Sequence, residues 1–329
     1  MRVAVIDMGT NSVRLLLAEV AGGRVRDVER LTTVTRLGAG VDRRRRLDAA
    51  AVARTRTCLS GYTSRIAGFG PETGLLASTS VLRDAADGAG FLAEAAALVG
   101  LPARVLSGEE EAALSFAGAL SGVGDHGGED ARARYDAHPR PAAVVVDIGG
   151  GSVELAVGSR EAPGPATPSF VCSLDVGVVR LTERFFVGDP PDEAQWAAAR
   201  EFVRVALDEA VPAGLRATVG EGIGLAGTFT TLVAHKLALR EYDRALVHGH
   251  VLTRADLAAA QAEFRRLTSA ERGRLPGIQP GREDVILAGT LLASEVCRAF
   301  ALDEVRVSEA DLLDGLALSL ASPDDPRRS

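Results

Sequence analysis

Residues 143–155 read AVVVDIGGGSVEL: a β-branched run that ends in an acid, a glycine-rich turn, and an alternating strand with a second acid. This pattern predicts a β-hairpin. Glycines let a backbone approach a ligand closely, and their N–H groups form a concavity that suits an anion such as phosphate. Asp147 and Glu154 are placed to hold a hard cation beside it. The alternative is a plain glycine hairpin with two surface acids.

The N-terminus repeats this pattern, because residues 5–15 read VIDMGTNSVRL. At an offset of 140 positions the coinciding pairs are Val5/Val145, Asp7/Asp147, Gly9/Gly149, Ser12/Ser152, Val13/Val153 and Leu15/Leu155. A long repeat that occurs twice indicates two related domains rather than a solenoid. Two such hairpins facing each other across a central cleft would hold a polyphosphorylated ligand from both sides.

Composition supports two domains and restricts the partners. A chain of 329 residues is long enough for two cores. The net charge of −7 argues against a nucleic-acid partner, so an anionic substrate would have to be attracted locally by arginines and backbone amides.

Cysteine usage and hydropathy indicate the cellular location. Cys58, Cys172 and Cys297 are far apart and form neither a disulfide framework nor a zinc motif. The N-terminus does not resemble a signal peptide, and no apolar run approaches the ~18 residues of a membrane span. We therefore expect a cytoplasmic protein without a membrane partner.

Alternating strand and helix patterns predict an α/β fold. Residues 123–141 are polar and rich in glycine and proline, which predicts a linker between a first domain at 1–122 and a second at 142–307. Ser308 and Asp311 are predicted to cap a final helix, and we expect residues 308–329 to join the first domain.

A second acidic motif begins at Ser107. Ser107 and Glu110 have the spacing of a capping box, which would leave Glu111 on the same helical turn to face the cleft. The alternative is that all the acids of this turn merely complement the helix dipole.

Two further signals have competing interpretations. Residues 222–227 match the dinucleotide fingerprint G-x-G-x-x-G, but residues 218–221 predict a poor strand, so a phosphate turn at 226–228 fits better than a nicotinamide site. The four consecutive arginines at 43–46 are typical of a solvated loop, or they steer a polyanion at the mouth of the cleft.

Taken in order, several motifs resemble the exopolyphosphatase / guanosine pentaphosphate phosphatase (Ppx/GppA) family in its short, two-domain form. They are DMGTNSVRL at 7–15, SVLRDA at 80–85, SGEEEA at 107–112, DIGGGSVEL at 147–155, SLDVGVVRLTE at 173–183, AGT at 226–228 and PGRED at 280–284. The resemblance implies a duplicated actin-like, ribonuclease H-like ATPase fold. It implies hydrolysis of terminal phosphate from inorganic polyphosphate with Mg²⁺, or with another divalent cation, and it allows stimulation by a monovalent cation.

The resemblance also implies residue roles. Glu111 matches the catalytic base, and Asp147 and Glu154 match the catalytic acids at the metal and water, with Asp7 as a further candidate metal ligand. The implied phosphate-binding residues are Asn11, Ser12, Arg14, Arg83, Gly149, Gly150, Gly151, Ser152, Gly227 and Thr228. The chain departs from longer members, which carry extra C-terminal domains, so the resemblance does not extend to their processivity on long chains. It also has Val153 where the family favours threonine, and we expect little effect from that difference.

Three alternatives stay open. A guanosine pentaphosphate or tetraphosphate phosphatase of the stringent response would use the same residues. A kinase of the same superfamily would need adenine and acceptor sites, and the Glu111 motif argues against it. A sensor that binds alarmone or polyphosphate without cleaving it would have no use for the three acids. A homodimer is a further expectation, because two-fold pairs are the commonest assemblies.

Overall fold

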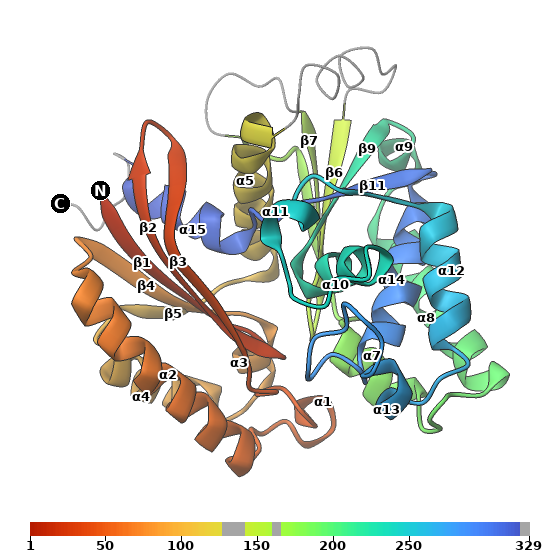
Figure 1. Cartoon of the computed structure of the whole chain (residues 1–329), viewed down its shortest axis with the longest axis horizontal. Coiled ribbons are helices and arrows are strands. Elements are labelled where there is room, and N and C mark those ends of the chain that lie inside the picture. Colours follow the sequence, from red (N-terminus) through yellow and green to blue (C-terminus); the bar gives the residue numbers. More distant parts are fainter. Residues whose placement is uncertain (127–141, 160–165, 323–329) are drawn as a thin grey trace. The chain divides into compact units, whose positions relative to one another are not determined.

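The computed structural model describes residues 1–126, 142–159 and 166–322. The chain forms two compact units (Figure 1). Unit 1 comprises Met1–Ser121 together with the segment that begins at Asp311, and unit 2 comprises Gly122–Ala310. None of the helices within these described ranges combines the length and the apolarity that a bilayer span requires.

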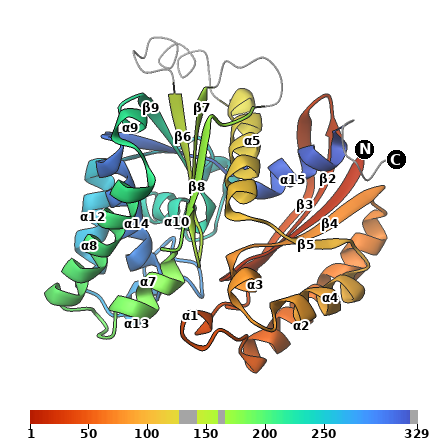
Figure 2. The same ribbon diagram turned by 180° about the vertical axis from the view of Figure 1, so that it is seen from behind.

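Unit 1 is built on a five-stranded sheet in the order β3-β2-β1-β4-β5. Its strands are β1 (Arg2–Met8), β2 (Ser12–Ala21), β3 (Arg24–Val34), β4 (Thr73–Ser78) and β5 (Ala103–Val105), and its helices are α1 (Val41–Arg44), α2 (Ala49–Phe69), α3 (Ser80–Asp84), α4 (Gly88–Val99), α5 (Gly108–His126) and α15 (Leu312–Ala321). Apolar residues of α2 and α4 pack on one face of the sheet, and those of α15 pack on the other (Figure 2). Alternation along the strands therefore decides which side chains meet α15.

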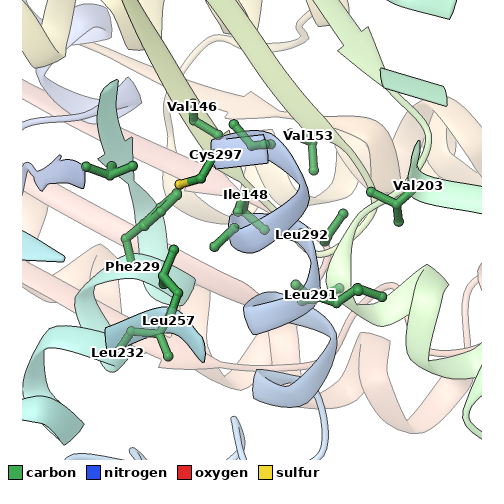
Figure 3. Close-up of a cluster of buried hydrophobic side chains, with 14 of the residues drawn as sticks. Val146, Ile148, Val153, Val203, Phe229, Leu232, Leu257, Leu291, Leu292 and Cys297 are labelled. Carbon is green, nitrogen blue, oxygen red and sulfur yellow. The ribbon is translucent and has the colours of Figure 1, made fainter. Parts of the chain in front are cut away.

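Unit 2 has a six-stranded sheet in the order β10-β11-β9-β6-β7-β8. Its strands are β6 (Ala142–Ile148), β7 (Val153–Ser159), β8 (Phe170–Leu174), β9 (Val219–Leu225), β10 (Val251–Thr253) and β11 (Glu304–Val307). Its helices are α7 (Val178–Phe185), α8 (Glu193–Ala210), α9 (Ala213–Arg216), α10 (Ala226–Lys236), α11 (Arg244–Val247), α12 (Arg254–Phe264), α13 (Ser269–Arg272) and α14 (Ile286–Ala299). Val146, Ile148 and Val153 of the sheet pack against Phe229 of α10 and Leu291 of α14 in the core (Figure 3).

The two units repeat one topology. The strands β3-β2-β1-β4-β5 correspond in order to β8-β7-β6-β9-β11, and β10 is an added edge strand. In both units the first three strands in sequence are antiparallel neighbours, whereas β4 and β5 of unit 1 and β9 and β11 of unit 2 run parallel to the first strand of their unit. Asp7 faces Arg14 across the first hairpin and Asp147 faces Glu154 across the second, in the same register. The predicted hairpins and the duplicated actin-like α/β fold are confirmed.

Two helices of unit 1 cross with their backbones in direct approach. A Cβ atom added at Gly118 of α5 would collide with the carbonyl oxygen of Asp311, and one added at Gly315 of α15 would collide with the carbonyl oxygen of Leu114. Only glycine leaves room for such a crossing. The crossing fixes α15 against the helix whose first turn carries Glu111.

The sequence prediction is wrong at two boundaries. Helix α5 runs through His126, so the predicted linker does not begin at residue 123, and its remainder, 127–141, lies outside the described residues. Ser308 does not cap α15: the cap is Asp311, with Asp314 as its capping-box partner, while the Ser308 hydroxyl accepts a hydrogen bond from the amide of Ala310. The second error arises because the Ser308 hydroxyl binds the neighbouring backbone at Ala310, a local partner that the sequence does not show.

The segment predicted to be a poor strand belongs to strand β9, although the pairing register with β6 shifts by one residue between Val219 and Glu221. It pairs with β6 on one side and with β11 on the other, and this pairing outweighs the low strand propensity of its glycines. Gly222 and Gly224 lie inside the strand, and a Cβ atom at Gly224 would be 2.5 Å from the ring of Phe229. The apparent fingerprint is thus a packing feature of a strand and not a dinucleotide loop.

The capping box of α12 carries a pH prediction. Burial raises the pKa of Asp256, but hydrogen bonds from Lys236 and Thr253 outweigh it and bring the pKa down to about 2. Because the folded-state pKa lies below the unfolded one, the stabilisation is present at neutral pH and is lost as pH falls from about 4 towards about 2. We expect Asp256→Asn to cost about 1 kcal/mol in the free energy of unfolding at neutral pH. Urea titrations should show this gap closing at acid pH, and a gap that is independent of pH would contradict the assignment.

Candidate active site

The carbonyl groups of the glycine turn of unit 2 are hydrogen-bonded by the start of α7. The amides of Val178, Val179 and Gly177 donate to the carbonyls of Gly149, Gly150 and Gly151 at 3.0, 2.8 and 3.1 Å, respectively. The side chain of Arg180 also donates from Nε to the Gly151 carbonyl at 3.0 Å. Within the described residues no hydrogen bond uses the amides of residues 150–152. These N–H groups are available to an anion.

The turn of unit 1 has the same construction. The amide of Gly9 donates to the Ser12 carbonyl at 3.0 Å, as that of Gly149 does to Ser152. The segment after β3 again donates hydrogen bonds to the carbonyls of the turn. The amides of Thr35 and Arg36 donate to the Asn11 carbonyl, and that of Gly38 donates to the Thr10 carbonyl at 2.8 Å. The repeated sequence therefore encodes a repeated turn whose carbonyls are engaged by the chain that follows the third strand.

Asp147 and Glu154 form the acidic pair of unit 2. They are direct cross-strand partners, and they lie on the sheet face opposite to Val146, Ile148 and Val153 of the core. Both are buried, with 5% and 2% exposure, and Glu154 Oε1 accepts a hydrogen bond from Ser173 Oγ at 2.7 Å. No group of three or more potential metal ligands occurs in the described parts of the chain. A pair of carboxylates nevertheless suits Mg²⁺, which takes one or two of them and completes its octahedron with water and phosphate oxygens.

Glu111 and Arg83 lie together in unit 1. The predicted capping box is confirmed, since Ser107 Oγ accepts from the Glu110 amide and Glu110 accepts from the Ser107 amide at 2.8 Å. Glu111 is 7% exposed, and its Oε2 is 3.5 Å from Nη1 of Arg83, which also donates to the Leu106 carbonyl at 2.6 Å. The cap thus occupies Glu110 and leaves Glu111 beside an arginine.

Asp7 and Arg14 belong to a buried ionic network that the sequence did not reveal. Arg14 Nε donates to Asp7 Oδ2 at 2.9 Å, and its Nη1 pairs with Asp311 at the start of α15. Asp311 and Asp314 also bind Arg30, at 3.4 and 2.7 Å. The guanidinium of Arg14, predicted to contact phosphate, is therefore engaged by two carboxylates.

Asp7 keeps one oxygen unengaged. Its Oδ1 is buried without a hydrogen-bond partner among the described residues. Burial raises the pKa of Asp7, and this outweighs the opposing influence of Arg14. An unsatisfied buried carboxylate oxygen next to this turn is suited to a cation or to a water bound by one.

The third turn follows β9, whose end lies beside that of β6, because Asp147 is the register partner of Leu225. Ala226 has a φ of 62°, a left-handed conformation, and Gly227 follows at the start of α10. A Cβ atom at Gly227 would collide with the guanidinium of Arg282. Arg282 belongs to the PGRED motif and was not predicted as a site residue, although its guanidinium lies directly against this turn.

The four arginines at 43–46 are all exposed, which agrees with the prediction of a solvated loop. Arg44, Arg45 and Arg46 are 3.9, 3.8 and 3.7 Å from the carboxylates of Asp48, Asp84 and Asp87, respectively. Nearby acids therefore balance much of this charge, which weakens the case for steering a polyanion.

Comparison with known proteins shows the family to which the chain belongs. The sequence profile of the Ppx/GppA phosphatase family matches residues 16–323. The chain belongs to this family. It is 40% identical to exopolyphosphatase 2 of Mycobacterium tuberculosis, an alignment that covers 97% of this chain and 98% of that protein.

Solved structures lead to the same family. The crystal structure of an exopolyphosphatase-like protein superposes with a TM-score of 0.86 at 35% identity, covering 100% of this chain and 99% of the other. A Ppx/GppA family member from Aquifex aeolicus superposes with a TM-score of 0.77 at 30% identity, covering 98% and 97%.

Proposed function

We propose that the protein is an exopolyphosphatase that releases terminal phosphate from inorganic polyphosphate with Mg²⁺. The observation that carries the proposal is the glycine turn of unit 2, whose unused amides lie beside two buried carboxylates. Membership of the Ppx/GppA family and the exopolyphosphatase relative support it.

In the proposed reaction, the amides of residues 150–152 bind the oxygens of the terminal phosphate. Asp147 and Glu154, with Asp7 as a further candidate, would hold Mg²⁺, which neutralises phosphate charge when it is bound. Glu111 accepts a proton from water as the water oxygen bonds to the terminal phosphorus. The bond to the bridging oxygen breaks, and orthophosphate and a shortened chain are released.

Two arginines and two further turns complete the proposed site. Arg83 beside Glu111 would bind a phosphate oxygen and orient the base. Asn11 and Ser12, in the turn of unit 1, and Gly227 and Thr228, at the start of α10, would supply further phosphate contacts. Arg14 would act chiefly by holding Asp7, since it is paired with the carboxylates of Asp7 and Asp311.

Two other functions would use the same groups. A guanosine pentaphosphate phosphatase differs in the leaving group, and the family name includes that activity. A sensor would bind these anions without cleaving them.

Purified protein should be assayed for phosphate release from short polyphosphate, long polyphosphate, guanosine pentaphosphate and ATP, each with Mg²⁺ and with chelator. We expect Mg²⁺-dependent release from polyphosphate, whereas release only from the guanosine compound, or binding without release, would support the alternatives.

The metal assignment has its own test. We expect Asp147→Asn to raise the Mg²⁺ concentration needed for half-maximal activity at least ~10-fold, because loss of a ligand charge weakens the site. Asp303→Asn is the matched control, since the Asp303 side chain is 94% exposed and its ion pair with Arg254 is long, at 3.8 Å. An unchanged Mg²⁺ requirement in Asp147→Asn would remove this residue from the metal site.

A cytoplasmic location and a homodimer stay predictions from the sequence.

A further inference from the structure

The three engaged carbonyls of the glycine turn determine the direction of its three unused amides. In a trans peptide the C=O of one residue and the N–H of the next lie in one plane and point in opposite directions. The carbonyls of Gly149, Gly150 and Gly151 all accept hydrogen bonds from α7 or from Gly177 just before it. The peptide planes so fixed are those that carry the N–H groups of residues 150–152.

Arg180 is the side chain that takes part in this arrangement. It is 6% exposed, whereas Arg184, one turn further along α7, is more accessible. Its Nε shares the Gly151 carbonyl with the Gly177 amide, and its Nη2 is 3.6 Å from Asp175. Burying a guanidinium has a large desolvation cost. An arginine that is buried against a loop carbonyl is therefore expected to have a specific role in holding that loop.

The packing around Arg180 brings α7 as close to the turn as the backbone allows. A Cβ atom at Gly177 would collide with the backbone of Gly150 and Gly151. In unit 1 the hydrogen bonds to the corresponding carbonyls of Thr10 and Asn11 come from the backbone amides of Thr35, Arg36 and Gly38. The side-chain donor is therefore an addition to the turn in unit 2, the turn next to Asp147 and Glu154.

We propose that Arg180 is a positioning residue for phosphate binding, an inference that rests on the proposed function. By holding the Gly151 carbonyl it directs the Ser152 amide, and together with the first turn of α7 it keeps the amides of 150–152 convergent. Arg180 does not bind the phosphate itself, because its Nε lies on the carbonyl side of these peptide planes.

The test compares Arg180→Met and Arg180→Lys with Arg184→Met. Arg184 lies in the same helix, with its guanidinium 5.5 Å from the ring centroid of Phe202, so it controls for losing an arginine from α7. We expect Arg180→Met to raise KM for polyphosphate and to weaken binding of inorganic phosphate by ~10- to 100-fold, since a misplacement of about 1 Å has effects of this size. Lysine can donate to the same carbonyl, so Arg180→Lys should recover part of the loss. Arg184→Met should behave as the wild type.

Two readouts separate this proposal from the proposed function. Inorganic phosphate binding by calorimetry, and NMR shifts of the amides of 150–152 on phosphate addition, do not depend on turnover. If the wild type releases no phosphate from polyphosphate, the proposed function fails while these readouts still test Arg180. If Arg180→Met does not fold, Gly177→Ala displaces the same turn and should weaken phosphate binding. A folded Arg180→Met or Gly177→Ala protein with wild-type phosphate affinity and amide shifts would overturn the proposal.

Discussion

Glu111→Gln is expected to reduce phosphate release from polyphosphate by about 10²- to 10⁴-fold, the range for loss of a general base. The variant has nearly the same size and retains hydrogen-bonding atoms, but its amide cannot accept the proton of the attacking water. Binding of polyphosphate should persist, because the amides of residues 150–152 are untouched. Initial rates of phosphate release, together with polyphosphate binding measured by calorimetry, check both parts.

The neighbouring acid provides the matched control. Glu110 forms the capping box with Ser107 and an ion pair with Arg104 at 2.7 Å, and glutamine serves in a capping box as well as glutamate does. Glu110→Gln should therefore keep its activity and its fold. If Glu111→Gln keeps activity within a few-fold of the wild type, Glu111 is not the base.

Gly315→Leu is expected to lower the free energy of unfolding by about 3 kcal/mol or more, the upper range for overpacking. Gly315 meets the backbone of Leu114 where α15 crosses α5, and backbone atoms cannot turn aside as a flexible side chain can: a Cβ would be 2.7 Å from the Leu114 carbonyl carbon. Activity should fall as well, since α5 carries Glu111. Urea unfolding monitored by circular dichroism measures the change.

The same substitution in α4 should act in the opposite direction. Gly90 is exposed, and a Cβ atom added there would have no neighbouring atom within 4 Å. Gly90→Leu should therefore stabilise the helix by about 0.5–1 kcal/mol through its higher helix propensity. Equal effects at the two positions would show that the helix crossing is looser than the structure indicates.

The features that were predictable from the sequence are local ones. The turns after Asp7 and Asp147 combine β-branched runs, an acid and glycine within a few residues, and their repetition alone indicates a duplicated fold. The capping box of Ser107 and Glu110 is equally local, and it correctly identified Glu110 as the acid that caps the helix. Short-range signals of this kind survive because few tertiary contacts compete with them.

The features that were missed depend on long-range contacts. Asp311 meets Arg14 across 297 positions of sequence, and this contact is the reason why we propose that Arg14 holds Asp7, whereas its role as a phosphate ligand stays a prediction from the sequence. The strand β9 forms despite its glycines because both neighbours pair with it. No pattern within the segment reports such a partner, since strand stability depends on cross-strand context.

The most direct test of the proposed hydrolysis is phosphate release from polyphosphate in H₂¹⁸O with Mg²⁺. The proposed mechanism predicts that orthophosphate is released singly from chain ends and that each molecule carries one solvent oxygen, with release lost in Glu111→Gln and in chelator. Phosphate without the label, transfer to an acceptor instead of water, or fragments cut from the middle of the chain would contradict it.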